Sequence, residues 1–337
     1  MKNDFKKKAL KKLFVILLIL ASSMTAQPKI SKIASMPGAF SRMGFGPRGI
    51  AMGNALSSVS EGNLTSYYNP ALSVMQSNAH LQASYSALTF DRHLNFVGFT
   101  KKFNLGHNKK TGKPISSAGL SIGIINSGVS NISGRDNQGF STGDLSTSEN
   151  QFFASISKKF GDKISAGISM KFYYYKLYEK MTATSFGLDL GLLYRATENL
   201  NFSLVVVDVN SSYKWDSSSL YDLYGRTSND DFPWLAKFGT SYYLKSFKTL
   251  IAVEYERSSV KTNYLRGGVE YSPVEKLFLR AGIDRLNISN FDEPALFSFG
   301  FEYTHTLLGL EMGMNYAFVI EHYSTGNRHV IGIILNL

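Results

Sequence analysis

The sequence contains no cysteine. An exported protein without cysteine cannot take its stability from disulfides, so it needs either a large apolar core or contact with lipid. A lipoprotein anchor is excluded as well, because such an anchor is attached through a cysteine thiol.

Long apolar runs are missing beyond the start of the chain. Residues 13–21 (LFVILLILA) form a short apolar run behind several lysines, and residues 22–26 offer a small-residue cleavage site that ends at Ala26. This pattern predicts a secretory signal peptide over residues 1–26, because the apolar run is too short to cross a bilayer as a helix. No later window is apolar over about 18 residues, which excludes an α-helical membrane span.

Charge of one sign is in only modest excess. The chain has 36 Lys and Arg against 25 Asp and Glu, and the predicted signal peptide holds six of the basic residues and one acidic residue. The remaining 30 and 24 give the mature chain a formal charge of about +6. Because the basic residues form no stripe interleaved with aromatic residues, we expect no nucleic-acid partner.

What the sequence does contain is alternation of apolar and polar residues, repeated along most of the chain. From Ile164 to Tyr174 the even positions are apolar, whereas the odd positions from Ser165 to Lys171 are serine, glycine or lysine. Segments of this kind predict 14 strands, over residues 79–90, 93–103, 116–127, 149–160, 163–176, 181–194, 198–210, 232–244, 247–257, 262–272, 275–287, 294–305, 307–319 and 327–337.

From the fourth strand onward the expected connections alternate between tight turns and longer polar loops, and the longest loops cover residues 127–148 and 210–231. The link over residues 105–113 is an exception, because it is fairly long where a short turn is expected. An even number of strands joined in this way is typical of an outer-membrane barrel, whose short turns face the periplasm. A soluble β-sandwich or propeller is the alternative, but small residues opposite each apolar face and a last strand that runs to Leu337 favour the barrel. The aromatic residues expected at one lipid interface precede the short turns: Phe160, Tyr194, Tyr242 or Tyr243, Tyr271 and Tyr303.

We therefore predict an all-β protein, a 14-stranded antiparallel transmembrane β-barrel over residues 79–337. A barrel of this size lined by small residues would leave an open channel. Residues 27–78 are free to fill it as a mostly helical or irregular plug, which we call the hatch. Asn69 is placed to cap a short helix that begins at Pro70. The hatch either packs in the lumen for stability or gates passage through it.

The stretch GPRGIAMGNALSSVSEGNLTSYYNPAL within the hatch resembles the N-terminal signature of FadL-like outer-membrane proteins. Mature length and spacing look closest to the PorV/PorQ branch, which is found with type IX protein secretion in Bacteroidetes-like bacteria. The resemblance implies a 14-stranded barrel with an N-terminal hatch, in a family that passes hydrophobic molecules and whose PorV-like members carry secreted proteins to surface attachment. The matching positions are Gly46, Arg48, Met52, Gly53, Ala55, Tyr67 or Tyr68, Asn69, Pro70 and Ala71.

Signals for chemistry are few. Residues 44–49 satisfy the dinucleotide pattern G-x-G-x-x-G, but no strand precedes them and Pro47 stiffens the loop. The six histidines show no metal-ligand spacing, and no G-x-S-x-G occurs on a strand-to-helix turn. We expect neither cofactor nor metal, and no enzymatic activity.

Charged residues on the predicted lumenal faces are better candidates for function. We expect them to form ion-pair networks that brace the wall or hold the hatch, and the alternative is selectivity for a polar or amphipathic cargo. This set comprises Lys171, Asp189, Glu254, Arg266, Glu270, Arg280, Asp284, Glu302 and Glu311.

The loop over residues 210–231 combines aromatic residues with serine and aspartate. Rigid aromatic side chains among small polar residues suit a protein-binding surface, and they suit anchoring at the outer lipid interface equally well. The residues concerned are Tyr213, Trp215, Tyr221, Tyr224 and, just beyond the loop, Trp234.

Two functions follow as hypotheses. In the first, the barrel assists type IX secretion by holding an exported protein or a translocon partner at its extracellular rim, with the aromatic loop as the contact. In the second, a hydrophobic small molecule enters from outside and leaves past the hatch. A barrel with a purely structural role is a third option. A lateral opening at a strand kink would favour uptake, whereas a sealed lumen with an exposed aromatic rim would favour the partner role.

Overall fold

A computed structural model describes residues 31–63, 66–107, 114–307 and 309–337 of the chain. The predicted signal peptide and the first four residues of the predicted hatch lie outside the described residues.

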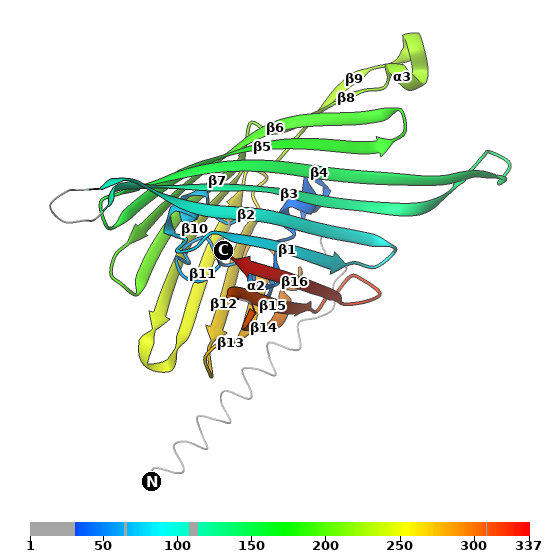
Figure 1. Ribbon diagram of the computed structural model, residues 1–337. Helices are drawn as coiled ribbons and strands as arrows, with labels where there is room; N and C mark the ends of the chain where they lie inside the picture. Colours follow the sequence, from blue (N-terminus) through cyan, green and yellow to red (C-terminus); the bar gives the residue numbers. More distant parts are fainter. Residues whose placement is uncertain (1–30, 64–65, 108–113, 308) are drawn as a thin grey trace.

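Fourteen antiparallel strands close into one barrel (Figure 1). Closure is made by β1 and β16, whose register runs from His80 opposite Asn336 to Ala87 opposite His329. The fold class and the number of barrel strands predicted from the alternation are therefore confirmed. The barrel strands are β1 (His80–Ala87), β2 (Arg92–His107), β3 (Pro114–Arg135), β4 (Ser141–Phe160), β5 (Ile164–Tyr178), β6 (Met181–Arg195), β7 (Leu200–Val209), β10 (Leu235–Leu244), β11 (Thr249–Ser258), β12 (Asn263–Tyr271), β13 (Leu277–Asn287), β14 (Leu296–Leu307), β15 (Leu310–Val319) and β16 (Arg328–Asn336).

The outer face of the barrel is apolar. Large side chains such as Met170, Phe186 and Phe299 point outward and are exposed, because they occupy the alternate positions whose neighbours face the lumen. A belt of this kind around a closed barrel is the surface that meets acyl chains in a membrane. Exposed rings lie beside the short connections, as predicted, at Phe160, Tyr194, Tyr242, Tyr271 and Tyr303, so we assign this end of the barrel to the periplasm.

The prediction of a long loop over residues 127–148 is wrong. Strands β3 and β4 continue as one hairpin to Arg135 and Ser141, and the side chain of Asp136 closes the turn by accepting from the backbone N–H groups of Gln138 and Phe140. This part of the hairpin extends well beyond the rest of the barrel (Figure 1). Most of its residues are serine, glycine, asparagine and threonine, and its few apolar residues, such as Val129, Ile132 and Leu145, do not alternate regularly with polar ones. The apolar alternation that marks a lipid-facing strand is therefore absent from this part of the sequence.

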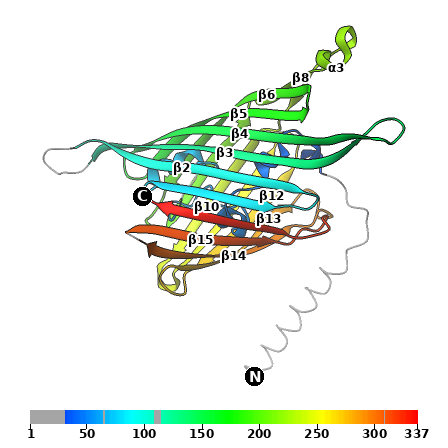
Figure 2. The same ribbon diagram turned by 45° about the vertical axis from the view of Figure 1, so that its right-hand side comes forward.

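The loop expected over residues 210–231 contains its own small sheet. Strands β8 (Ser212–Asp216) and β9 (Thr227–Asp231) pair as a hairpin, and its tip carries α3 (Ser218–Tyr221) and η4 (Asp222–Tyr224). We call this unit the β8–β9 hairpin. Its tip projects past the extracellular end of the barrel (Figure 2).

The hatch lies inside the barrel. It consists of short turns of helix, η1 (Lys32–Ser35), η2 (Ala39–Arg42), α2 (Pro47–Ala51) and η3 (Pro70–Met75). The segment α2 has only five residues and is followed by turns. Asn69 caps η3 as predicted, because its Oδ1 accepts from the N–H of Ala71 at 2.9 Å. In the described ranges, no helix is long and apolar enough to cross a membrane.

Glycines in the wall let the hatch backbone approach the strands. A Cβ on Gly282 of β13 would overlap the backbone of Gly53, and a Cβ on Gly167 of β5 would overlap the carbonyl of Pro70. Serine pairs then join the two surfaces, as between Ser57 and Ser203, whose Oγ atoms lie 2.9 Å apart. Hatch and wall are thus in close backbone contact, with short hydrogen bonds between them.

Candidate ligand-binding lumen

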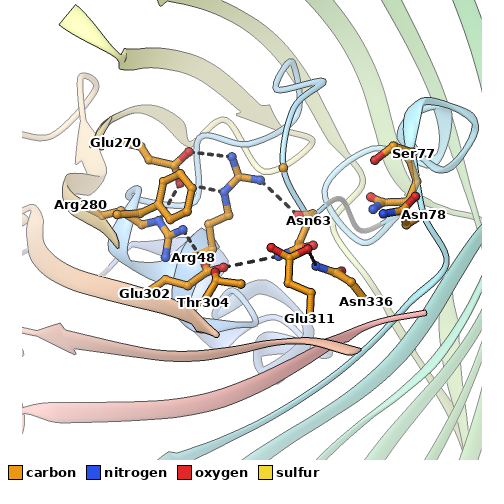
Figure 3. A pocket seen from close by; sticks show the side chains of 13 residues that line it. Arg48, Asn63, Ser77, Asn78, Glu270, Arg280, Glu302, Thr304, Glu311 and Asn336 are labelled. Atoms are coloured by element: carbon orange, nitrogen blue, oxygen red, sulfur yellow. Dashed lines mark hydrogen bonds and ion pairs between the residues drawn. The ribbon is translucent and has the colours of Figure 1, made fainter. Parts of the chain in front are cut away.

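The periplasmic half of the lumen is held by an ion-pair chain that begins on the hatch. Arg48 of α2 donates from Nε and Nη2 to the two carboxylate oxygens of Glu270, both at 2.9 Å. Arg280 donates to Glu270 at 2.7 Å and to Glu302 at 2.6 Å, and the side chains lie close together in Figure 3. The remaining nitrogen of Arg48 donates to the carbonyls of Glu61 and Asn63, so one guanidinium ties two hatch segments to the wall.

The bidentate contact keeps Arg48 charged. Burial alone would lower the pKa of Arg48, but the carboxylate of Glu270 and its hydrogen bonds outweigh burial and raise that pKa. The contact therefore persists at every pH at which Glu270 is ionised.

A second ion-pair network lies on the extracellular side of the first. Arg266 donates to Glu256 at 2.7 Å and to Asp284 at 2.6 Å, and Lys237 lies 3.4 Å from Glu256. The hatch joins this network through Asn54, whose Nδ2 donates to Asp284 at 2.8 Å. Both networks therefore connect the hatch to β11–β14, which agrees with the expectation that lumenal charges brace the wall and hold the hatch.

A third group of charges sits at an irregularity between β6 and β7. Lys171 lies 2.7 Å from Asp189 and 3.1 Å from Asp208. Asp208 has a left-handed backbone (φ 58°), and the register of β7 against β6 jumps between Leu188 and Leu190. The bulge turns the Asp208 side chain into the lumen, where Lys171 compensates the two carboxylates.

All nine charges predicted to face the lumen do so. Glu311 differs from the others because it is exposed at the periplasmic mouth, where it accepts from Asn336 at 3.1 Å. Three further charges of these networks, Lys237, Glu256 and Asp208, were not predicted. Glu256 has the same strand parity as the predicted Glu254, so period two could have found it. Asp208 occupies a position of β7 that would face outward in a regular strand. Only the bulge turns its side chain into the lumen.

Two cavities of similar size lie on opposite sides of the hatch. The periplasmic cavity, about 210 Å³, is lined by polar groups that include Arg48, Asn63 and Glu311, as Figure 3 shows. The extracellular cavity, about 230 Å³, places the apolar side chains of Ile33 and Met43 beside arginines of hatch and wall. Between them lies a smaller cavity of about 20 Å³, lined by Asn54 and Tyr68 of the hatch and by Arg266 of the wall.

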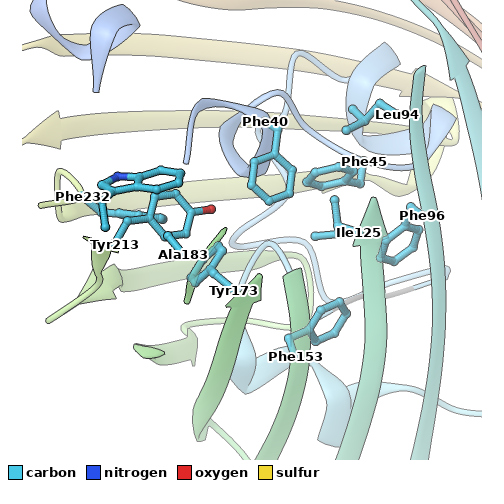
Figure 4. Close-up of a cluster of buried hydrophobic side chains, with 11 residues drawn as sticks. Phe40, Phe45, Leu94, Phe96, Ile125, Phe153, Tyr173, Ala183, Tyr213 and Phe232 are labelled. Atoms are coloured by element: carbon cyan, nitrogen blue, oxygen red, sulfur yellow. The ribbon is translucent and has the colours of Figure 1, made fainter. Parts of the chain in front are cut away.

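Aromatic and apolar side chains fill the lumen beside the extracellular half of β2–β6. This aromatic cluster joins Phe45, Phe96 and Phe153 on one side to Tyr173 and the β8–β9 hairpin on the other (Figure 4). Rings are in direct contact along it, with Phe45 and Phe96 centroids 5.9 Å apart and those of Tyr173 and Phe232 4.8 Å apart. Its other buried members are Phe40, Leu94, Ile125, Ala183, Tyr213 and Trp215.

The wall is interrupted next to this cluster. Residues 181–187 of β6 pair with β5, but in the described part of the chain they have no strand partner on the β7 side, where pairing starts only at Leu188. The base of the β8–β9 hairpin covers the gap from the lumen, since the N–H of Ser212 donates to the Ser185 hydroxyl at 2.8 Å. We call this interruption the seam. It is a lateral discontinuity in the extracellular half of the barrel, covered by the base of the β8–β9 hairpin.

The structure divides the aromatic residues predicted to form one contact loop. Tyr213 and Trp215 are buried in the aromatic cluster, so they are not available at the surface. Tyr221 and Tyr224 are exposed at the hairpin tip, and Trp234 is exposed just before β10. Residues 212–216 form β8, in which Tyr213 and Trp215 are buried and their neighbours are not. The alternation of aromatic and polar residues over this segment is the local sequence signal for this division.

The hatch residues of the sequence motif serve several structural purposes. Arg48 makes the ion-pair chain, and Gly46 precedes α2 with φ 72°, a left-handed conformation that suits glycine. Met52 and Ala55 pack with Tyr68 in a buried cluster. Gly53 touches the wall, and the remaining three, Asn69, Pro70 and Ala71, form the start of η3 against β5 and β6.

Among the described residues, no group of three or more His, Cys, Asp or Glu side chains is arranged to hold a metal ion.

No family model matches the sequence, and no curated protein matches it. Solved structures do resemble the fold. The Pseudomonas putida toluene transporter TodX has a TM-score of 0.54 at 15% identity, over 87% of this chain and 96% of that one. A TodX mutant described as a monoaromatic hydrocarbon channel has a TM-score of 0.56 at 14% identity, over 87% and 98% of the two chains. A Pseudomonas aeruginosa FadL homologue has a TM-score of 0.50 at 11% identity, over 86% and 96%. These neighbours share the fold of a FadL-like 14-stranded barrel.

Proposed function

We propose that this protein is an outer-membrane channel for the uptake of hydrophobic small molecules, which reach the lumen through the seam and leave past the hatch. The observation that carries the proposal is the seam. There the described extracellular part of β6 does not pair with β7, and the aromatic cluster lies directly behind it in the lumen. The structural neighbours described as a toluene transporter and as a monoaromatic hydrocarbon channel support the same class of ligand.

The chemistry of the aromatic cluster suits such a ligand. A hydrophobic molecule that leaves lipid exchanges acyl chains for aromatic rings and need not cross water. The hydroxyl of Tyr213 is buried and has no hydrogen-bond partner in the described part of the chain, so it is available to a polar atom of a ligand. The cluster is therefore an apolar site with one polar contact.

Two tryptophans allow this site to be tested directly. Trp215 lies in the aromatic cluster and Trp234 lies on the outside of the barrel, and the chain has no third tryptophan. In lipid nanodiscs, the Trp234→Phe protein reports on Trp215 alone, and the Trp215→Phe protein reports on Trp234 alone. We expect 4-bromotoluene to quench Trp215 saturably and to quench Trp234 in proportion to its concentration in the bilayer. Quenching of Trp215 that never saturates would contradict the proposal.

A second function is favoured by the hairpin tip. Leu223 is 97% exposed and Tyr224 is 89% exposed, on a unit that projects beyond the barrel. Exposed apolar side chains far from the lipid belt are costly unless a partner covers them. This tip is where a barrel of the PorV/PorQ type, accessory to type IX secretion, would hold an exported protein or a translocon component.

Replacing both tip residues tests this second function. We expect the Leu223→Ser/Tyr224→Ser protein to lose any secretion component or exported protein that the unaltered chain retains when it is purified from detergent-solubilised outer membranes. Phe140→Ser, at the tip of the β3–β4 hairpin where Phe140 is also exposed, is the matched control. Equal recovery of such partners with and without the tip residues would remove the hypothesis.

A further inference from the structure

The outer wall of the barrel has an apolar groove on β2–β5 near the periplasmic end. Its volume is about 640 Å³, within the roughly 300–1,000 Å³ usual for small-molecule sites. The groove exists because Ala118 and Ala166 are small, whereas the outward neighbours Phe103, Ile156 and Ile168 are large. These residues face the membrane, so the groove opens to lipid and not to the lumen.

Register places two lysines at this groove. Phe103, Ala118, Lys158 and Ala166 form one row across β2–β5. Lys101 lies in the next row, on the outward face of β2. Lys158 itself lines the groove.

Both lysine side chains bend toward the periplasmic interface. The Nζ of Lys101 lies 5.5 Å from the ring centroid of Phe103, and the Nζ of Lys158 lies 5.6 Å from that of Phe160. Each ring is two residues closer than its lysine to the periplasmic end of its strand, so each ammonium group reaches toward the level of the lipid headgroups. Among the described residues, neither lysine forms an ion pair with a carboxylate.

We infer that the groove is a binding site for an anionic phospholipid of the periplasmic leaflet. An acyl chain lies over Ala118 and Ala166, and the phosphate accepts hydrogen bonds from Lys101 and Lys158. Basic side chains above an apolar pocket at the membrane interface are the features that recognise anionic headgroups. The site goes beyond uptake through the seam, because it lies on the outside of the wall and at the opposite end of the barrel.

Charge favours a lipid over a second copy of the chain as the occupant. A symmetric dimer through this face would bring the lysines of one protomer toward those of the other. A phosphodiester removes that repulsion, whereas a neutral or zwitterionic lipid leaves both ammonium groups without a net counter-charge.

Native mass spectrometry of the detergent-purified protein tests the site. The protein is incubated with equal amounts of phosphatidylglycerol and phosphatidylcholine that carry identical acyl chains, and the retained lipid is counted. We expect the unaltered protein to retain about twentyfold more phosphatidylglycerol than phosphatidylcholine. In each of Lys101→Gln and Lys158→Gln we expect this ratio to fall about fivefold. Ala166→Leu fills the groove and is expected to abolish retention of both lipids.

Matched variants keep the test decisive. Lys248→Gln removes a lysine from the short connection after β10, and Ala281→Leu enlarges an outward alanine on β13, so both should retain phosphatidylglycerol. Equal retention of the two lipids, or unchanged retention in the Lys101→Gln/Lys158→Gln protein, would overturn the inference. The inference would also be overturned if Ala166→Leu lost dimers of the chain but still retained lipid, because a second copy would then be the occupant of the groove. If the double lysine variant fails to fold, the comparison of Ala166→Leu with Ala281→Leu decides.

Discussion

Replacing Arg48 by methionine is expected to loosen the hatch and to raise the ion conductance of the reconstituted barrel. Arg48 is the cation that links α2 to Glu270 through two hydrogen bonds of 2.9 Å, and its side chain also binds the carbonyls of Glu61 and Asn63. Methionine fills much of the same volume without making any of these contacts. Removing one partner of a buried ion pair costs about 3–5 kcal/mol. Without Arg48, the buried carboxylates of Glu270 and Glu302 would share the single charge of Arg280.

Planar-bilayer recordings and thermal unfolding in detergent measure the two consequences of this change. The control is Lys245→Met, which breaks the exposed pair between Lys245 and Glu198 at 3.0 Å and should leave the conductance and the melting temperature almost unchanged. If Arg48→Met and Lys245→Met leave conductance and melting temperature equally unchanged, Arg48 does not hold the hatch.

The sequence predicted the barrel because lipid imposes one rule on every strand. A residue that faces acyl chains must be apolar and its neighbours must face the lumen, so Ile164 to Tyr174 and their counterparts could be assigned without knowledge of the tertiary structure. The same parity placed Lys171, Arg266 and Glu302 inside. Local chemistry was equally sufficient for η3, where Asn69 and Pro70 mark the start of a helix.

Features outside the lipid could not be predicted in this way. The part of β3 and β4 that extends beyond the barrel is surrounded by water on both faces. Its composition does not distinguish it from a polar loop. Asp208 enters the lumen only because of the bulge in β7. The path of the hatch depends on wall glycines such as Gly167 and Gly282, which lie 97 and 229 residues from Pro70 and Gly53, the hatch residues that they contact. This close approach was therefore visible only in three dimensions.

The largest effect on transport is expected from closing the seam covalently. A Cβ built on Gly187 of β6 lies 3.4 Å from the Cβ of Ser211 at the base of the β8–β9 hairpin, close to the roughly 3.5–4.5 Å spacing of disulfides. Because the chain has no cysteine, the Gly187→Cys/Ser211→Cys protein has these two thiols alone. Its disulfide would fix the hairpin against β6 and leave the hatch, the cavities and the ion-pair networks unaltered.

The single-cysteine proteins are the controls, since each carries the steric change without the cross-link. A loss of transport in the Gly187→Cys protein alone would report the added side chain in the aromatic cluster, and the Ser211→Cys protein should transport normally. Reduction of the double-cysteine protein separates the cross-link from both substitutions.

The decisive measurement is the initial rate at which labelled toluene accumulates in cells that produce the Gly187→Cys/Ser211→Cys protein, oxidised and then reduced. Passage through the seam predicts that the oxidised protein gives the rate of cells without the barrel, and that reduction restores the rate of the unaltered chain. Equal rates in the two redox states, both above the rate of cells without the barrel, would contradict that path. A rate that the unaltered barrel does not raise at all would contradict uptake itself.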